Sequence, residues 1–304
     1  MQKVFIVYTT SIMERQDLLN VSRSGVLLID CPDRRGLVAR IAQYLYAHGA
    51  NILHSDQHQD NEAGRFFMRI EWSLDEFDLS EDAFRREFST IAQEFKMAWR
   101  LAWAGQRQRI AIFVSRYQHC LMDLLHRNQI GELGGELVMV VSNHQDAKPL
   151  ADFYGVPFHE FPKTAANKHE VEKQEIALLE KERVNLVVLA RYMQVLSAEF
   201  VARFPERIIN VHHSFLPAFT GAKPYHAAFE RGVKLIGATS HYVTEDLDEG
   251  PIIEQDVARI SHRDQVQNLI QKGRDLERVV LSRAVRWHLD HRILFYGNKT
   301  VIFD

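Results

Sequence analysis

The sequence is poor in cysteine, with two in 304 residues. Cys31 and Cys120 stand far apart and lack the paired spacing that binds zinc. This scarcity excludes a disulfide-stapled secreted fold and favours a reducing compartment. We therefore expect both cysteines to be small buried side chains, and we expect no disulfide, no cysteine nucleophile and no metal.

Long apolar runs and an excess of one charge are absent as well. No stretch of 18 apolar residues occurs, which argues against a transmembrane helix. The 37 basic and 40 acidic residues are interspersed, so no strong field attracts nucleic acid. Residues 1–22, interpreted as an N-terminal extension, hold an apolar run too short for a signal peptide. These absences predict a cytoplasmic protein without nucleic-acid or membrane partners.

The patterns that are present predict two domains, because 304 residues exceed one small core. Residues 23–103 alternate between strand-like and helix-like patterns in the order βαββαβ, which predicts a small ferredoxin-like domain. The successive segments are residues 26–29, 37–48, 51–59, 65–74, 80–95 and 96–103.

A polar stretch containing glycine, AGQRQR at 104–109, is the expected linker, with a second domain at 110–304. Four short apolar runs follow, RIAIFVS, LVMVVS, VNLVVLA and RIINVH, with helical patterns between them. Such runs are typical of parallel strands covered on both faces, which predicts a Rossmann-like α/β domain with a mostly parallel sheet. A long amphipathic helix is expected at 264–289. In such sheets, ligands bind outside the carboxyl ends of the strands.

The stretch NVHHSFLPAF, residues 210–219, lies at the carboxyl end of the RIINVH run. Downstream, GATSHYV and PIIEQDV read as strands joined by the acidic loop TEDLDEG, which can bring Asp248 beside His212. An acid partner orients a histidine that takes a proton, and Asn210 offers an N–H donor for an oxyanion. Together the three suit attack by water or an amine on an acyl or formyl carbon. Taken singly, each residue has a plainer interpretation: Asn210 as a strand cap, His212 as a core histidine and Asp248 as a turn former.

Two histidine-containing stretches raise the question of a metal. His212 and His213 are adjacent, so on an extended segment they point to opposite sides and do not readily hold one ion together. In HSDQHQD, four ligand-type side chains share one side of a predicted strand: His54, Asp56, His58 and Asp60. No further cysteine or histidine run supports a metal set. The pattern favours the solvent face of a strand over a metal site.

Residues 108–288 resemble the formyltransferase fold, whose members share an N-x-H-x-S-x-L-P element and a downstream T-x-x-L-D-x-G-P loop. The resemblance implies that Asn210, His212 and Asp248 are the catalytic set. It also implies that VVLARYMQVLS, residues 187–197, lines a folate pocket with its backbone around the pterin. His241 either supports the acidic loop or packs within its strand. The substrate-binding residues implied are Arg191, Tyr192, Met193, Gln194, Val195, Leu196 and His241.

The N-terminal half resembles an ACT domain, a βαββαβ module that often senses amino acids. The runs CPDRRGLVARIA, AGRFFMRIEW and SRYQHCLMDLL, together with the domain order, resemble the formyltetrahydrofolate deformylases. The resemblance implies an effector site at the turn DRRGL, near Asp33, Arg34 and Gly36, for glycine or methionine. An ACT domain that serves only to build oligomers is the alternative, and a homo-oligomer, either a dimer or a tetramer, is expected.

The loop after the first strand of the second domain separates hydrolysis from formyl transfer. Relatives that formylate glycinamide ribonucleotide carry a Gly-rich phosphate loop there, whereas this chain has SRYQH, residues 115–119, without glycine. Arg116 leaves open an anion site formed by a side chain. The resemblance implies hydrolysis of 10-formyltetrahydrofolate to tetrahydrofolate and formate. Folate is then the substrate and no cofactor is needed; the formate would supply purine synthesis and balance one-carbon folate pools. The alternatives are a formyltransferase to an unidentified amine and a non-catalytic amino-acid sensor.

Overall fold

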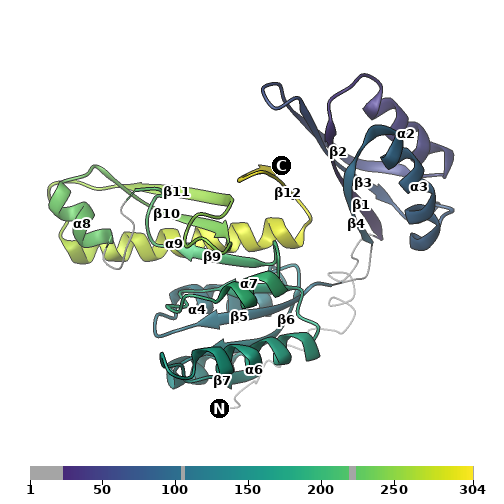
Figure 1. The fold of residues 1–304 in the computed structure, drawn as a ribbon. Coiled ribbons are helices and arrows are strands. Elements are labelled where there is room, and N and C mark those ends of the chain that lie inside the picture. Colours follow the sequence, from purple (N-terminus) through teal and green to yellow (C-terminus); the bar gives the residue numbers. More distant parts are fainter. Residues whose placement is uncertain (1–22, 104–106, 219–223, 304) are drawn as a thin grey trace, which may run out of the picture. The chain divides into compact units, whose positions relative to one another are not determined.

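The computed structural model describes residues 23–103, 107–218 and 224–303. The extension expected at 1–22 lies outside these described residues. The chain forms two compact units, one on either side of residues 104–106 (Figure 1). Arg109, which falls in the stretch interpreted as a linker, is the first residue of a strand in the second unit.

The first unit is a four-stranded antiparallel sheet with two helices. Its order β2-β3-β1-β4 confirms the expected ferredoxin-like arrangement. Apolar side chains from both helices and from alternate residues of β1 and β3 form the core, which includes the free thiol Cys31. The elements are β1 (Ser24–Pro32), α2 (Leu37–Ala47), β2 (Asn51–Asp60), β3 (Arg65–Ser73), α3 (Glu81–Phe95) and β4 (Ala98–Trp103).

The second unit is built on a seven-stranded sheet of order β11-β10-β9-β8-β5-β6-β7. Neighbouring strands from β5 to β9 pair in parallel, and β10 and β11 are antiparallel, which confirms a mostly parallel sheet. The strands are β5 (Arg109–Val114), β6 (Glu136–Ser142), β7 (Phe158–Glu160), β8 (Leu186–Leu189), β9 (Ile208–His212), β10 (Leu235–Tyr242) and β11 (Ile252–Arg259).

Helices cover both faces of this sheet, so its strands are apolar on both sides. Along β5, Ile110 and Ile112 join one core cluster, whereas Ala111 and Phe113 join the other. This double burial explains the continuous apolar runs in the sequence. The helices are α4 (His119–Gln129), α5 (Lys148–Phe153), α6 (Lys168–Lys181), α7 (Ala198–Arg203), α8 (Pro224–Arg231) and α9 (Val266–Leu289), with a 3-10 turn η1 at Gln145–Ala147. Among the described residues, no helix combines the length and apolarity that a membrane span requires.

The strand order reverses between β5 and β8. From β5 the chain moves outward through β6 and β7, then returns to the other side of β5 as β8. The carboxyl ends of these two strands therefore flank the crevice where parallel sheets bind ligands. Ser115 follows β5 and Arg191 follows β8 at this edge, where the Ser115 N–H donates to the Arg191 carbonyl.

Two details differ from the sequence predictions. The long helix begins at Val266 rather than at residue 264, because Gln265 and Asn268 cap each other's backbone N–H groups there. A hairpin of β12 (Ile293–Tyr296) and β13 (Lys299–Ile302) follows it. This hairpin was not predicted, because two four-residue strands give too little periodicity to recognise.

Candidate active site

Strand register brings two of the predicted catalytic side chains to one edge. Asn210 and His212 stand two residues apart on β9, so they point to the same side of the sheet. β10 pairs with β9 in antiparallel register, which places His241 directly opposite Asn210. The Nδ2 atom of Asn210 lies 3.2 Å from Nε2 of His241.

Asp248 comes from the loop between β10 and β11. Its φ of 58° is left-handed, a conformation that aspartate tolerates better than most residues. Two residues on, Gly250 packs against the chain so closely that a Cβ atom there would lie 1.8 Å from the Tyr242 carbonyl oxygen. Asn298, in the C-terminal hairpin, donates to the Glu249 carbonyl at 2.9 Å. The loop is therefore held from both sides, and Asp248 is presented at a defined place.

The structure brings the three predicted catalytic residues together. Oδ2 of Asp248 lies 3.2 Å from Nδ1 of His212, and Oδ1 lies 3.6 Å from Nε2 of His241. Both histidines are buried, while the Asp248 side chain keeps 19% exposure. Nε2 of His212 is also buried and makes no hydrogen bond within the described part of the chain. Nε2 of His212 is therefore available to exchange a hydrogen bond or a proton with a bound ligand.

Hydrogen bonding places a proton on Nδ1 of both rings. Nδ1 of His241 lies 2.9 Å from the Tyr242 carbonyl oxygen, which only accepts, so Nδ1 carries a proton, and Nε2 of the same ring faces both Asn210 and Asp248. Nδ1 of His212 faces the Asp248 carboxylate and donates to it, which leaves Nε2 with a lone pair. The contact with His212, followed by that with His241, holds the pKa of Asp248 well below its usual range. Asp248 is thus a fixed anion that orients His212.

The segment predicted to line a folate pocket has two kinds of side chain. Arg191 and Tyr192 are buried, whereas Met193 and Val195 are about half exposed. Gln194 is half-buried, as is Leu196, which packs against the core. The Met193 N–H donates to the Ser115 hydroxyl at 3.0 Å, so the loops after β5 and β8 are joined. Folate binding by this segment stays a prediction. The apolar side chains that the segment exposes are Met193 and Val195.

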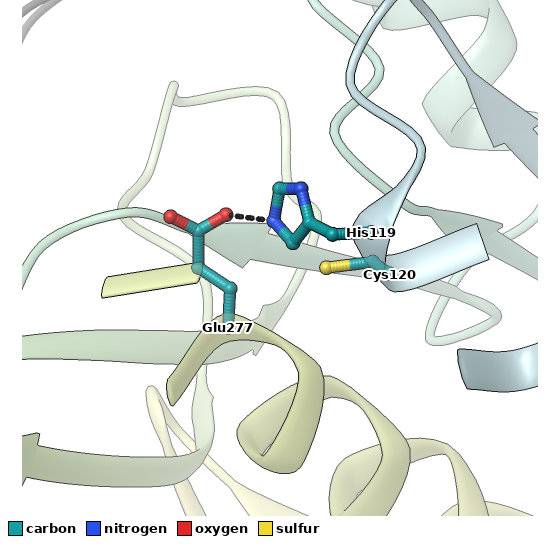
Figure 2. A group of neighbouring side chains, drawn as sticks. All are labelled: His119, Cys120 and Glu277. Atoms are coloured by element: carbon teal, nitrogen blue, oxygen red, sulfur yellow. Dashed lines mark hydrogen bonds and ion pairs between the residues drawn. The ribbon is translucent and has the colours of Figure 1, made fainter. Parts of the chain in front are cut away.

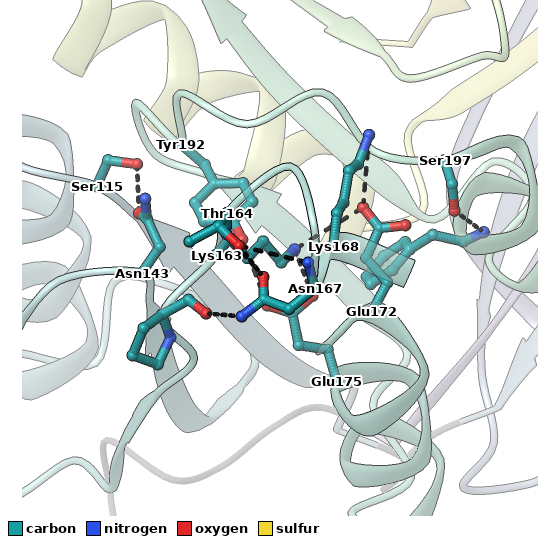
Figure 3. A network of polar contacts seen from close by, with 12 residues as sticks. Ser115, Asn143, Lys163, Thr164, Asn167, Lys168, Glu172, Glu175, Tyr192 and Ser197 are labelled. Atoms are coloured by element: carbon teal, nitrogen blue, oxygen red, sulfur yellow. Dashed lines mark hydrogen bonds and ion pairs between the residues drawn. The ribbon is translucent and has the colours of Figure 1, made fainter. Parts of the chain in front are cut away.

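A buried ionic cluster anchors this segment from below (Figure 3). Nζ of Lys163 lies 2.7 Å from Glu175 and 3.8 Å from Glu172, and all three side chains are at most 2% exposed. The Tyr192 hydroxyl donates to Glu175 at 3.3 Å. Burial raises the pKa of Glu175 even though Lys163 opposes the shift. Helix α6 thereby holds the loop after β8 in place through the hydrogen bond between Glu175 and Tyr192.

A second buried cluster lies beside the reversal of strand order (Figure 2). Glu277, from α9, is 1% exposed. Its Oε2 lies 2.7 Å from Nε2 of His119 and 3.4 Å from Nε of Arg191, and its Oε1 accepts from the Tyr225 hydroxyl at 2.7 Å. Burial by itself raises the pKa of Glu277, but the His119 hydrogen bond and the Arg191 charge outweigh it and lower that pKa. Glu277 is therefore a buried, ionised carboxylate whose negative charge is balanced by the Arg191 guanidinium.

Cys120 adjoins the same cluster, and the ligand atoms of His119, Cys120 and Glu277 lie within 4.8 Å of one another. Burial raises the pKa of the Cys120 thiol well above its ordinary value, which disfavours the thiolate a metal needs. The guanidinium of Arg191 beside the same carboxylate also repels a cation. The geometry thus suits an ion pair better than a metal centre.

Other side chains considered in the sequence lie elsewhere. His54 and His58 on β2 are exposed, with Asp56 and Asp60 half-buried. His213 is buried, and its ring centroid lies 5.2 Å from that of His212 and 6.1 Å from that of Tyr225.

In the first unit, the predicted effector residues Asp33, Arg34 and Gly36 line an open pocket of about 560 Å³. Its other walls are Leu37, Val38, Ala39, Gln57, His58, Gln59 and Phe66. The Gln59 side chain donates to Asp33, and the Arg34 guanidinium lies 4.5 Å from the Phe95 ring centroid. The pocket thus combines a carboxylate, a guanidinium and an apolar wall.

Each of the two units matches a known protein family. The formyl transferase family matches residues 108–285 and the ACT domain family matches residues 25–79. Fold and site thus define a formyl transferase-class protein with an N-terminal ACT domain. The chain is 54% identical over 280 residues to the formyltetrahydrofolate deformylase of a Synechocystis species, covering 92% of this chain and 98% of that protein. The chain belongs to the formyltetrahydrofolate deformylase family.

Solved structures show the same relationship. The formyltetrahydrofolate deformylase of Pseudomonas syringae superposes with a TM-score of 0.91 at 45% identity, over 96% of this chain and 99% of that one. Glycinamide ribonucleotide transformylase 1 from Symbiobacterium toebii superposes with a TM-score of 0.61 at 31% identity, over 67% of this chain and 98% of that one. Deformylase and transformylase therefore share the second unit's fold.

Glu277 and the Lys163 cluster were not predicted from the sequence. A signal for Glu277 was present, because it continues the buried stripe of α9 that contains Leu269, Gly273 and Val280. A charged residue in an apolar stripe indicates a buried partner. For Lys163 no signal was available, since it precedes α6 in a loop.

Proposed function

We propose that this chain hydrolyses 10-formyltetrahydrofolate to tetrahydrofolate and formate at the site formed by Asn210, His212 and Asp248. The observation that carries the proposal is the unpartnered, buried Nε2 of His212, whose other nitrogen donates to a carboxylate of lowered pKa. Asp248, whose pKa is lowered by its histidine partners, suits orientation, and the unpartnered Nε2 of His212 suits proton transfer.

In the proposed reaction, water attacks the formyl carbon and gives a proton to Nε2 of His212. The resulting imidazolium is stabilised by Asp248 through Nδ1. The formyl oxygen becomes an oxyanion and accepts the Asn210 N–H that does not face His241. Collapse of the tetrahedral intermediate breaks the bond to N10, which takes the proton from Nε2. Formic acid and tetrahydrofolate leave, the acid releases its remaining proton to solvent to become formate, and His212 returns to its neutral form.

Formate release from 10-formyltetrahydrofolate without any added amine tests the proposal. Asp248→Asn is expected to abolish most of this activity, and Asn210→Ala to reduce the rate by about 10²–10³. Asp246→Asn is the matched control, because Asp246 is exposed in the same loop. Folded wild-type protein that releases no formate would contradict the proposal and favour transfer to an amine.

We also propose that the pocket at Asp33, Arg34 and Gly36 binds a free amino acid, glycine or methionine, and that the chain forms a homo-oligomer. The carboxylate and guanidinium in one pocket support amino-acid binding. Titration calorimetry with each amino acid is expected to show binding that Asp33→Ala removes and that Asp82→Ala, on exposed α3 surface, leaves intact. Unchanged binding by Asp33→Ala would place the effector elsewhere.

A further inference from the structure

The C-terminal hairpin, formed by β12, β13 and the turn between them, is anchored in the second unit. Ile293 and Leu294 are buried at its base, and Phe303, directly after β13, is 1% exposed. The Phe303 N–H donates to the Arg292 carbonyl at 2.9 Å and closes the base. Because its base is buried, the hairpin can act as a support for the parts of the chain that its strands and turn contact.

The hairpin contacts both ends of the loop that carries Asp248. At the start of the loop, the Phe295 ring lies edge-on to the ring of Tyr242, the last residue of β10, with centroids 4.8 Å apart. At the end of the loop, the Thr300 hydroxyl donates to the carbonyl of Ile252, the first residue of β11, at 2.6 Å. The hairpin thus connects the two strands between which the loop runs.

A third contact lies directly beside Asp248. Nδ2 of Asn298, in the turn of the hairpin, donates to the carbonyl of the next residue, Glu249, at 2.9 Å. The backbone of Asp248 is in the left-handed region, with φ of 58°, and a residue with a Cβ atom needs surrounding contacts to stay there. The hairpin supplies such a contact one residue away.

The place of the Asp248 carboxylate is sensitive to small movements of this loop. Its two oxygens lie 3.2 Å from Nδ1 of His212 and 3.6 Å from Nε2 of His241, at the long end of the hydrogen-bonding range. A further displacement of about 1 Å would break both contacts, and a misplacement of that size in a catalytic group can cost about 10²-fold in rate. A support outside the loop is therefore relevant to the chemistry.

We infer that the C-terminal hairpin places Asp248 against His212, with Asn298 and Thr300 as positioning residues for the reaction. The inference rests on the proposed hydrolysis, because it gives the hairpin a role at that same site. Both side chains act through loop carbonyls and not on the substrate segment 191–196. Their removal should therefore lower kcat and change KM little.

Variants of nearly constant size test the inference. Thr300→Val removes the hydroxyl, and Asn298→Asp replaces the donor by an acceptor. Each is expected to lower kcat for formate release by about two- to tenfold, the equivalent of one hydrogen bond. Thr300→Ser, which keeps the hydroxyl, is expected to retain wild-type kcat. Lys299→Met is the control within the hairpin, because Nζ of Lys299 lies 5.7 Å from the ring centroid of Tyr296 on the same hairpin.

A double variant separates positioning from a general structural effect. In an Asp248→Asn background, Thr300→Val is expected to change the residual rate by less than about twofold, because the carboxylate that it positions is already gone. Wild-type kcat in both Thr300→Val and Asn298→Asp would overturn the inference. So would an equal loss in Thr300→Ser and Thr300→Val, or an undiminished effect of Thr300→Val in the Asp248→Asn background.

Hydrogen exchange of peptides covering residues 243–251 keeps this test independent of the proposed hydrolysis. Faster exchange in Thr300→Val than in Thr300→Ser is expected, because the loop opens more often when its support is lost. Equal exchange in the two variants would overturn the inference whatever the activity. Wild-type protein that releases no formate would contradict the proposed hydrolysis, and the exchange comparison would still decide whether the hairpin holds the loop.

Discussion

Replacing Lys163 by Met should expose the cost of leaving two carboxylates buried without their cation. Nζ of Lys163 lies 2.7 Å from Glu175 and 3.8 Å from Glu172, in a cluster at most 2% exposed. Breaking a buried pair by removing one partner costs about 3–5 kcal/mol, mainly because an uncompensated charge stays away from water. Met matches the length of the Lys stem, so lost packing adds little. We expect the free energy of unfolding of the second unit to fall by about 3–5 kcal/mol.

The pH dependence of this loss follows from Glu175. Burial already raises its folded-state pKa, and without Lys163 that pKa rises further. A raised carboxyl pKa favours the protonated folded form, so the relative stability is present below the unfolded pKa, about 4.3, and is lost as pH rises through the folded value. Lys163→Met should therefore be most destabilising near neutral pH and progressively less so toward pH 4.

Hydrogen exchange of peptides from α6 is the suitable assay, because three of the four tryptophans, Trp72, Trp99 and Trp103, report on the first unit. Lys168→Met is the matched control, since Lys168 is 38% exposed and 4.0 Å from Glu172, and should cost at most about 1 kcal/mol. Equal protection in the two variants would refute the account of Lys163 as a buried counter-ion.

Three further outcomes follow from the loop that carries Asp248. Gly250→Ala would force a Cβ to within 1.8 Å of the Tyr242 carbonyl oxygen, so the loop must move, and kcat for formate release should fall about 10²-fold while the far-UV CD spectrum is kept. Asn298→Ala removes the hydrogen bond to the Glu249 carbonyl and should lower local protection of this loop in hydrogen exchange by about 0.5–1.5 kcal/mol. The lowered pKa of Asp248 stabilises the fold above its unfolded pKa of about 3.9, and this contribution is lost as pH falls through the folded value. Urea unfolding should thus show a constant difference between wild type and Asp248→Asn from pH 7 to about pH 5 that shrinks below pH 4; a difference already shrinking at pH 6 would contradict the assignment.

The periodicities of the chain were sufficient to predict both main sheets, although not the short C-terminal hairpin. Two-residue alternation and helical stripes predicted the βαββαβ unit, and continuous apolar runs predicted the parallel sheet, because burial on one or two faces dictates those patterns. The catalytic candidates Asn210 and His212 could be placed at a strand end for the same reason. Asp248 needed only the assumption that an acidic loop between two strands returns to the sheet.

What the sequence by itself determined is thus the class of fold and the chemical types gathered at one edge of the second sheet. The tertiary structure alone decided the contacts of His241, the cation beside Glu172 and Glu175, and the partners of the buried Glu277. A sequence pattern reports which face of a helix or strand is buried, but not which distant side chain meets it there. Glu277 shows this clearly: its place on the buried stripe of α9 was readable, whereas its partners His119 and Arg191 come from loops that only folding brings together.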